Sequence, residues 1–163
     1  MRHSFIRIAA LTTAITVMAA LPATAGAATT GGGQFGAATL TISVGQPTLG
    51  QKVVVDVPVT VSCTRNPTAL PEFPQYGTGG QVTIIQAVGK YSTIGITYLP
   101  SFACDGAPHT IALQVIADPA AGGLHFKKGQ ATIRASASAT GFDANFMFGS
   151  DSVDTGWLPV SIK

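Results

Sequence analysis

The sequence is poor in charge and in the residues on which most catalytic and metal sites depend. Only 10% of its 163 residues are Asp, Glu, Lys or Arg, and it has three histidines, two cysteines and one tryptophan. A serine nucleophile needs a neighbouring base, and the chain has no Gly-x-Ser-x-Gly motif. We therefore expect no enzyme activity, no cofactor and no bound metal.

No apolar run is long enough to span a membrane. The longest runs over residues 8–21, short of the ~20 residues that a spanning helix needs. Arg2 and Arg7 precede it, and the small residues Ala23-Thr24-Ala25 follow it. This order is typical of a secretory signal peptide, cleaved after Ala25 or two residues later. We expect a secreted, extracellular protein with no membrane span after cleavage.

The chain without its signal peptide has no excess charge of either sign. Removing residues 1–25 leaves seven basic and seven acidic residues. A neutral domain without a basic stripe lacks the electrostatic attraction that binding to nucleic acid or to anionic lipid requires. We expect neither partner.

The remaining residues are enough for one domain with a core of its own. Residues 26–36 are glycine-rich and small, so we expect a flexible leader there, followed by a single domain over 37–163.

Apolar residues recur with a period of two, which indicates strands. The clearest strand covers residues 51–63, where valines at alternate positions and Cys63 share one face, so Cys63 should point into the core. Pro58 lies on the other face and has no N–H to donate, which predicts a sheet edge or a bulge there.

Further strands follow from the same alternation, and no useful window outside the signal peptide has a helical pattern. We expect one hairpin from 38–44 and 51–63 with its turn at 45–50, and a second from 81–88 and 91–99 around Gly89-Lys90. In the second we place Ile94, Ile96 and Tyr98 on the face in phase with Cys104. The other predicted strands are 109–117, 130–140 and 158–162. Seven or eight short strands predict an all-β, two-sheet, immunoglobulin-like sandwich.

Two cysteines in a secreted chain predict one disulfide, between Cys63 and Cys104. The closed loop spans 42 residues, for which loop-closure entropy gives roughly 4 kcal/mol of stabilisation. We expect the bridge to resemble the inter-sheet disulfide of immunoglobulin domains. Unlike in those domains, Trp157 follows both cysteines instead of lying between them.

The stretch 104–110, CDGAPHT, brings a cysteine, an aspartate and a histidine together. Asp105 to Pro108 has the composition of a tight turn, and His109 would then cap turn carbonyls at the rim of the next strand. The alternative is a metal site, which would need Cys104 reduced and two further ligands.

These residues also carry a resemblance. A cysteine after a valine-rich strand, then Cys-Asp-Gly-x-x-His, then Phe-Lys-Lys-Gly-Gln-Ala, is similar to small secreted actinobacterial domains of unknown function. The matching residues are Cys63, Cys104, Asp105, Gly106, His109, Phe126, Gly129 and Ala131. The resemblance implies export and an immunoglobulin-like sandwich, and implies no known activity.

Aromatic residues in loops are the candidate contacts. Phe73 and Tyr76 lie in the proline-rich segment 64–80, where binding residues on a rigid sandwich are often found. Phe146 and Phe148 could form an exposed cluster, but their alternation favours ordinary inward-facing strand residues. Oxygen donors from Asp151 to Thr155 could surround a calcium ion, but their spacing does not fit an EF-hand, and a plain loop is the favoured interpretation.

Two hypotheses on function remain. The first is an exported, non-catalytic binding or structural module of the cell envelope or the extracellular space, which contacts an unknown protein or envelope partner through residues 64–80. The second is a small secreted hydrolase or lectin-like domain with Asp105 and His109, or Asp151 and Asp154, at its site. A stoichiometric metal in the purified protein would favour the second.

Overall fold

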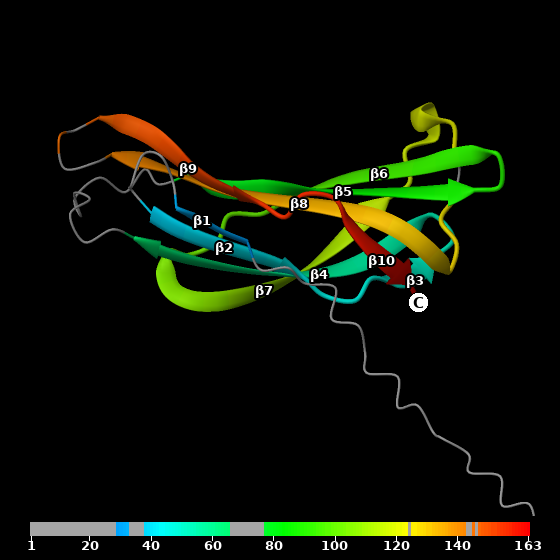
Figure 1. Cartoon of the computed structure of the whole chain (residues 1–163), viewed down its shortest axis with the longest axis horizontal. Helices are drawn as coiled ribbons and strands as arrows, with labels where there is room; N and C mark the ends of the chain where they lie inside the picture. The colour runs from blue at the N-terminus through cyan, green and yellow to red at the C-terminus, as the bar shows by residue number, and fades with distance from the viewer. Residues whose placement is uncertain (1–28, 33–37, 66–76, 124, 143–144, 146) are drawn as a thin grey trace, which may run out of the picture.

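The chain folds as a two-layered β-sandwich (Figure 1). The computed structural model describes residues 29–32, 38–65, 77–123, 125–142, 145 and 147–163. The first antiparallel sheet contains β1 (Thr29–Gly32), β2 (Ala38–Val44), β3 (Thr48–Gln51), β4 (Val54–Arg65) and β7 (Asp105–Ile116). The second contains β5 (Thr78–Val88), β6 (Tyr91–Leu99), β8 (Gly129–Phe142), β9 (Phe148–Asp154) and β10 (Leu158–Ile162). The predicted all-β, two-sheet sandwich is confirmed.

The described residues hold more strand segments than the seven or eight predicted, because one strand is split in each sheet. β2 and β3 both pair with β4, and residues 45–47 separate them. β9 and β10 both pair with β8, and residues 155–157 separate them. β1 adds a further segment inside the expected flexible leader, where Thr29–Gly32 pairs with β2. The prediction of a flexible leader is therefore wrong for these four residues.

Pro58 lies in the middle of a central strand, not at a sheet edge. β4 has β2 and β3 on one side and β7 on the other. The Pro58 carbonyl accepts a hydrogen bond of 2.8 Å from the Gly45 N–H. In a strand the N–H and the carbonyl of one residue point to the same side, so the N–H that Pro58 lacks would face residues 45–47. The partner strand is interrupted there, so no hydrogen bond of the sheet is lost. The predicted hairpin turn at 45–50 is this interruption, and the chain reverses at residues 52 and 53 instead.

The core lies between the two sheets and consists mainly of alternate residues of β2, β4 and β8. Cys63 is fully buried, as predicted, and the inward alanines and the isoleucine of β8 are buried as well. Each fully buried valine or isoleucine stabilises the fold by about 1.5–3 kcal/mol relative to an exposed one. The small inward residues of β8 allow the opposite sheet to approach closely.

β6 has the opposite orientation to the one that its sequence predicts. Thr93 and Leu99 are buried, whereas Ile96 and Tyr98 are 46% and 73% exposed. Gly95 and Thr97 share this inward face, and an added Cβ at Gly95 would lie 2.7 Å from the Ile116 carbonyl oxygen. An inward isoleucine at this place would collide with β7, so the larger side chains point outward.

The predicted disulfide between Cys63 and Cys104 is present. It is not an inter-sheet bridge, because Cys63 lies in β4 and Cys104 directly precedes β7, the neighbour of β4 in the same sheet. The bridge fastens the connection from β6 to β7 where that connection enters the first sheet. The expected resemblance to the immunoglobulin disulfide is therefore wrong in this respect.

None of the helices among the described residues has the length and apolar character needed to cross a membrane.

Candidate functional site

Phe73 and Tyr76 of the predicted contact loop lie outside the described residues, as does Phe146. Phe148 is 61% exposed, and its ring meets that of Phe142 edge to face, with 5.2 Å between the centroids. The favoured interpretation of Phe148 as an inward strand residue is therefore wrong.

Asp105 and His109 come together, but not across a tight turn. β7 already begins at Asp105, and a shift in its register against β4 accommodates Gly106 with a φ of +84°. Across this irregular start, His109 Nε2 lies 2.9 Å from Asp105 Oδ1, which also accepts the Ala107 N–H. These two hydrogen bonds, that from His109 first, lower the pKa of Asp105 below its ordinary value. His109 thus contacts a carboxylate instead of turn carbonyls.

Asp151 and Asp154 belong to β9 instead of a loop, and they point to opposite faces of the sheet. Asp151 is fully buried and accepts the Ala38 N–H at 2.7 Å, which ties β9 to the start of β2. Asp154 faces outward and bonds Arg134. The two carboxylates cannot act as a pair, and the loop interpretation is wrong for residues 151–154, whereas Thr155 follows the strand. The described residues contain no group of three or more His, Cys, Asp or Glu placed to hold a metal ion.

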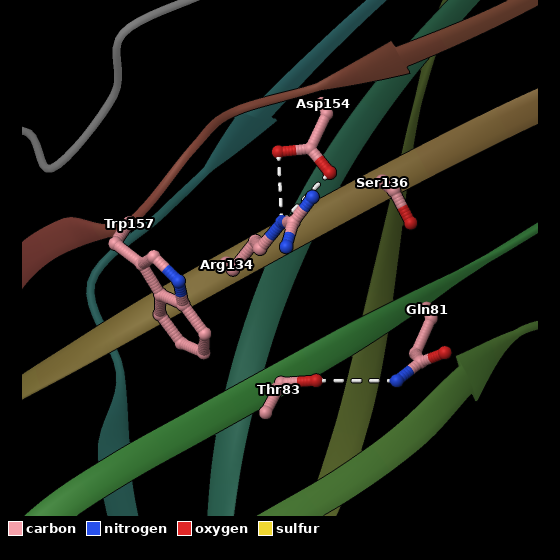
Figure 2. A pocket seen from close by; sticks show the side chains of 6 residues that line it. All are labelled: Gln81, Thr83, Arg134, Ser136, Asp154 and Trp157. Carbon is pink, nitrogen blue, oxygen red and sulfur yellow. Dashed lines mark hydrogen bonds and ion pairs between the residues drawn. The ribbon is translucent and has the colours of Figure 1, made fainter.

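The outer face of the second sheet carries a site that the sequence analysis did not single out. An open depression of about 270 Å³ lies there, lined by Gln81, Thr83, Arg134, Ser136, Asp154 and Trp157 (Figure 2). β5, β8, β9 and the segment between β9 and β10 contribute these residues, and β6 extends the same surface. We call this surface the outer platform.

The register aligns the side chains of the outer platform in two rows across the strands. One row runs from β9 to β6 through directly paired residues: Asp154, Ser136, Gln81 and Tyr98. The second row lies beside it and contains Trp157, Arg134, Thr83 and Ile96. With strands about 4.8 Å apart, each row is roughly 14 Å long. The platform is therefore a strip across the sheet and not a single pocket.

An ion pair fixes the polar centre of the outer platform. Arg134 Nε lies 3.0 Å and 2.9 Å from the two carboxylate oxygens of Asp154 (Figure 2). Both hydrogen bonds come from Nε, and the Nη groups of the half-exposed Arg134 side chain carry further N–H donors. Gln81 donates to the Thr83 hydroxyl at 3.2 Å, and its amide oxygen remains an acceptor. The surface thus offers donors and acceptors side by side without a net charge.

A rigid turn presents Trp157 next to this ion pair. Thr155 is buried, and its hydroxyl accepts the Ala135 N–H at 3.0 Å while its own N–H bonds the Ala135 carbonyl. Asp154 accepts the Gly156 N–H at 2.7 Å, and Gly156 has a φ of +66°, which favours glycine. The following indole is 48% exposed and lies on the same side of the sheet as Arg134 (Figure 2).

The fold and this surface define the class of protein: a β-sandwich with one internal disulfide and with an aromatic and polar platform on one sheet. No family model, curated protein or solved structure matches the chain. The resemblance to small secreted actinobacterial domains stays a prediction.

Proposed function

We propose that the protein is an exported, non-catalytic binding module that holds a neutral carbohydrate on the outer platform. The proposed module agrees with the first hypothesis from the sequence, but its contact lies on the second sheet instead of residues 64–80. Its lectin-like character comes from the second hypothesis. The observation that carries the proposal is the alignment of an exposed tryptophan, an exposed tyrosine and a charge-neutral set of donors and acceptors along one strip.

Carbohydrate chemistry fits this combination. A sugar ring has an apolar face whose polarised C–H groups match the negative face of an aromatic ring, here Trp157 or Tyr98. Its hydroxyls both donate and accept, as do the side chains of Gln81, Thr83 and Ser136. Because Arg134 and Asp154 neutralise each other, the strip favours a neutral ligand over an anionic or cationic one.

A hydrolase is less well supported. Asp105 and His109 form an exposed pair, with 51% and 36% of their side chains accessible, away from the outer platform. Asp151 and Asp154 face opposite sides of β9. Neither pair flanks a position where a glycosidic bond could lie between two carboxyl groups.

The test is native affinity electrophoresis in gels that contain starch, a mixed-linkage β-glucan, a mannan or an arabinogalactan. We expect at least one of these to retard the wild-type protein. Trp157→Ala should weaken that binding roughly thirtyfold, as truncation of an interface hot spot costs about 2 kcal/mol or more.

A matched pair of isoleucines supplies the control. Ile96 lies on the outer platform and is 46% exposed, whereas Ile116 lies at the end of β7 in the other sheet and is 58% exposed. Ile96→Ala should reduce retardation, and Ile116→Ala should not. If no polysaccharide retards the wild type, or if Trp157→Ala migrates like the wild type, the proposal is wrong.

A further inference from the structure

The neutral total charge conceals an uneven distribution of lysines. The described residues contain seven Lys and Arg side chains, and five of them lie at one end of the sandwich, the right-hand end in Figure 1. We call this the lysine end: Lys52 in the turn before β4, Lys90 between β5 and β6, Lys127 and Lys128 before β8, and Lys163 after β10.

Backbone contacts bring these five lysines together from distant parts of the chain. The Lys52 carbonyl accepts the Phe126 N–H at 2.8 Å, next to Lys127. Ile162 pairs with Gly129, which places Lys163 beside Lys128. Lys90 lies at the same end because β5 and β8 pair as far as Ile85 and Thr132.

None of the five lysine side chains forms an ion pair with a described residue. Asp56 and Asp118 are the described acids nearest this end. They contact Gln114 and the Ala120 N–H respectively. Within the described fold, the five lysines at this end outnumber these two acids, and no ion pair fixes any of the lysine side chains.

The segment that carries Lys127 and Lys128 is held firmly although it is not a strand. The Phe126 side chain is 1% exposed and anchors the segment in the core. The buried Gln86 amide donates to the Lys127 carbonyl at 2.7 Å and accepts the Lys127 N–H at 2.8 Å. Thr93 donates to the His125 carbonyl at 3.0 Å. The backbone that carries the two lysines is thus held in place by the core and by these hydrogen bonds.

Apolar side chains are exposed among these charges. Val53, in the turn before β4, is 42% exposed, and Tyr91, the first residue of β6, is 57% exposed. The Lys90 ammonium lies 5.4 Å from the centroid of the Tyr91 ring. Beside Val53 an open depression of about 530 Å³ lies between the turn before β4 and the segment before β8. It is lined by Leu49, Val53, His125 and Phe126 together with Lys52, Lys127 and Lys128.

We propose that the lysine end docks on the surface of an anionic lipid bilayer. Lysines near such a surface are attracted by its negative potential, and tyrosine is favoured at the boundary between headgroups and acyl chains. A soluble polyanion would use the lysines alone and would leave Val53 and Tyr91 in water. The combination of lysines without an ion pair and exposed apolar residues beside them therefore favours a bilayer. This surface is separate from the outer platform, so either proposal can fail alone.

The experiment is flotation of the purified protein with vesicles made of equal parts phosphatidylglycerol and phosphatidylcholine, compared with vesicles of phosphatidylcholine alone. Binding is expected only to the anionic vesicles. It should weaken as the salt is raised from ~0.1 M to ~1 M, because the screening length then falls from ~10 Å to ~3 Å.

Charge-matched variants test whether the position of the charge decides the binding. Lys128→Gln at the lysine end and Arg65→Gln at the opposite end of β4 each remove one positive charge. Lys128→Gln should weaken binding roughly fivefold, and Lys127→Gln together with Lys128→Gln more than tenfold. Arg65→Gln should bind like the wild type. Equal losses in Lys128→Gln and Arg65→Gln would overturn the proposal, as would absence of binding to the anionic vesicles.

Tyr91→Ala distinguishes a bilayer from a soluble polyanion. It should weaken vesicle binding and leave the salt dependence unchanged, since it removes no charge. If Tyr91→Ala binds vesicles like the wild type and inorganic polyphosphate binds in the same lysine-dependent way, the lysine end is a polyanion site and the bilayer proposal is wrong.

Discussion

The two ends of the sandwich are closed by different chemistry. At one end the Cys63–Cys104 disulfide links the entry of β7 to β4, and the buried Asp151 ties β9 to Ala38. At the lysine end no disulfide links the described strands. There Gln86 and Thr93 hold the segment before β8 by hydrogen bonds. The disulfide can thus be opened by reduction as well as by substitution, whereas the hydrogen bonds at the lysine end do not respond to reducing conditions.

The largest expected effect is loss of the disulfide. Replacing both Cys63 and Cys104 by serine should lower the free energy of unfolding by roughly 4 kcal/mol, because the unfolded chain regains the entropy of an open loop. Urea unfolding of the oxidised and the double-serine proteins measures this difference. A loss well below 1 kcal/mol would mean that the hydrogen bonds at this end suffice without the bridge.

Gln86→Ala should have the next largest effect, and it acts at the other end. The variant leaves the Lys127 N–H and carbonyl without their partner, at an expected cost of about 1–3 kcal/mol. Hydrogen exchange should become faster at the Lys127 amide first. Gln114→Ala is the matched control, because Gln114 is exposed on the first sheet and its loss should change stability by no more than ~0.5 kcal/mol. Equal losses in the two variants would contradict a structural role for Gln86.

The smallest expected effect concerns Asp105, close to the disulfide. His109→Ala should raise the pKa of Asp105 toward its ordinary value of 3.8, while the Ala107 N–H keeps it somewhat lowered. A carboxyl whose pKa is lowered by folding stabilises the fold above its unfolded pKa, and that contribution is lost as the pH falls through the folded pKa. Because the pair is exposed, the acid unfolding midpoint should move little. Carboxyl titration by NMR checks this, and an unchanged Asp105 curve in the variant would contradict it.

Alternation predicted the strands that are buried on one face. In β8 the inward alanines alternate with Thr132, Arg134 and Ser136, so the pattern has one solution. In β6 the more apolar face, with Ile94, Ile96 and Tyr98, is the outward one, so alternation alone favours the wrong face. The choice depends on how closely β7 approaches, which is a property of the tertiary structure.

The outer platform could not be predicted from the sequence because its members meet only through the register. One row of the platform takes its residues from four strands, and the sequence of a single strand does not determine how it aligns with the others. These residues are Tyr98, Gln81, Ser136 and Asp154. In the sequence, Trp157 stands apart only by following both cysteines. The available signal was the outward Arg134 on a strand otherwise lined by serine and threonine. The lysine end likewise depends on which turns share an end of the sandwich.

The absence of a side chain at Gly95 has a consequence for the solubility of the protein. Gly95 forms an isolated bridge with Ala117, and the Asp118 N–H donates to the Ile94 carbonyl at 2.7 Å, so the end of β7 crosses over and covers part of the β6 edge. An uncovered edge strand is a template on which a second chain can add a strand and start aggregation. Here the backbone of residues 117 and 118 occupies part of the β6 edge, so a second chain cannot pair there. A side chain at position 95 would collide with the end of β7 and expose this part of the edge.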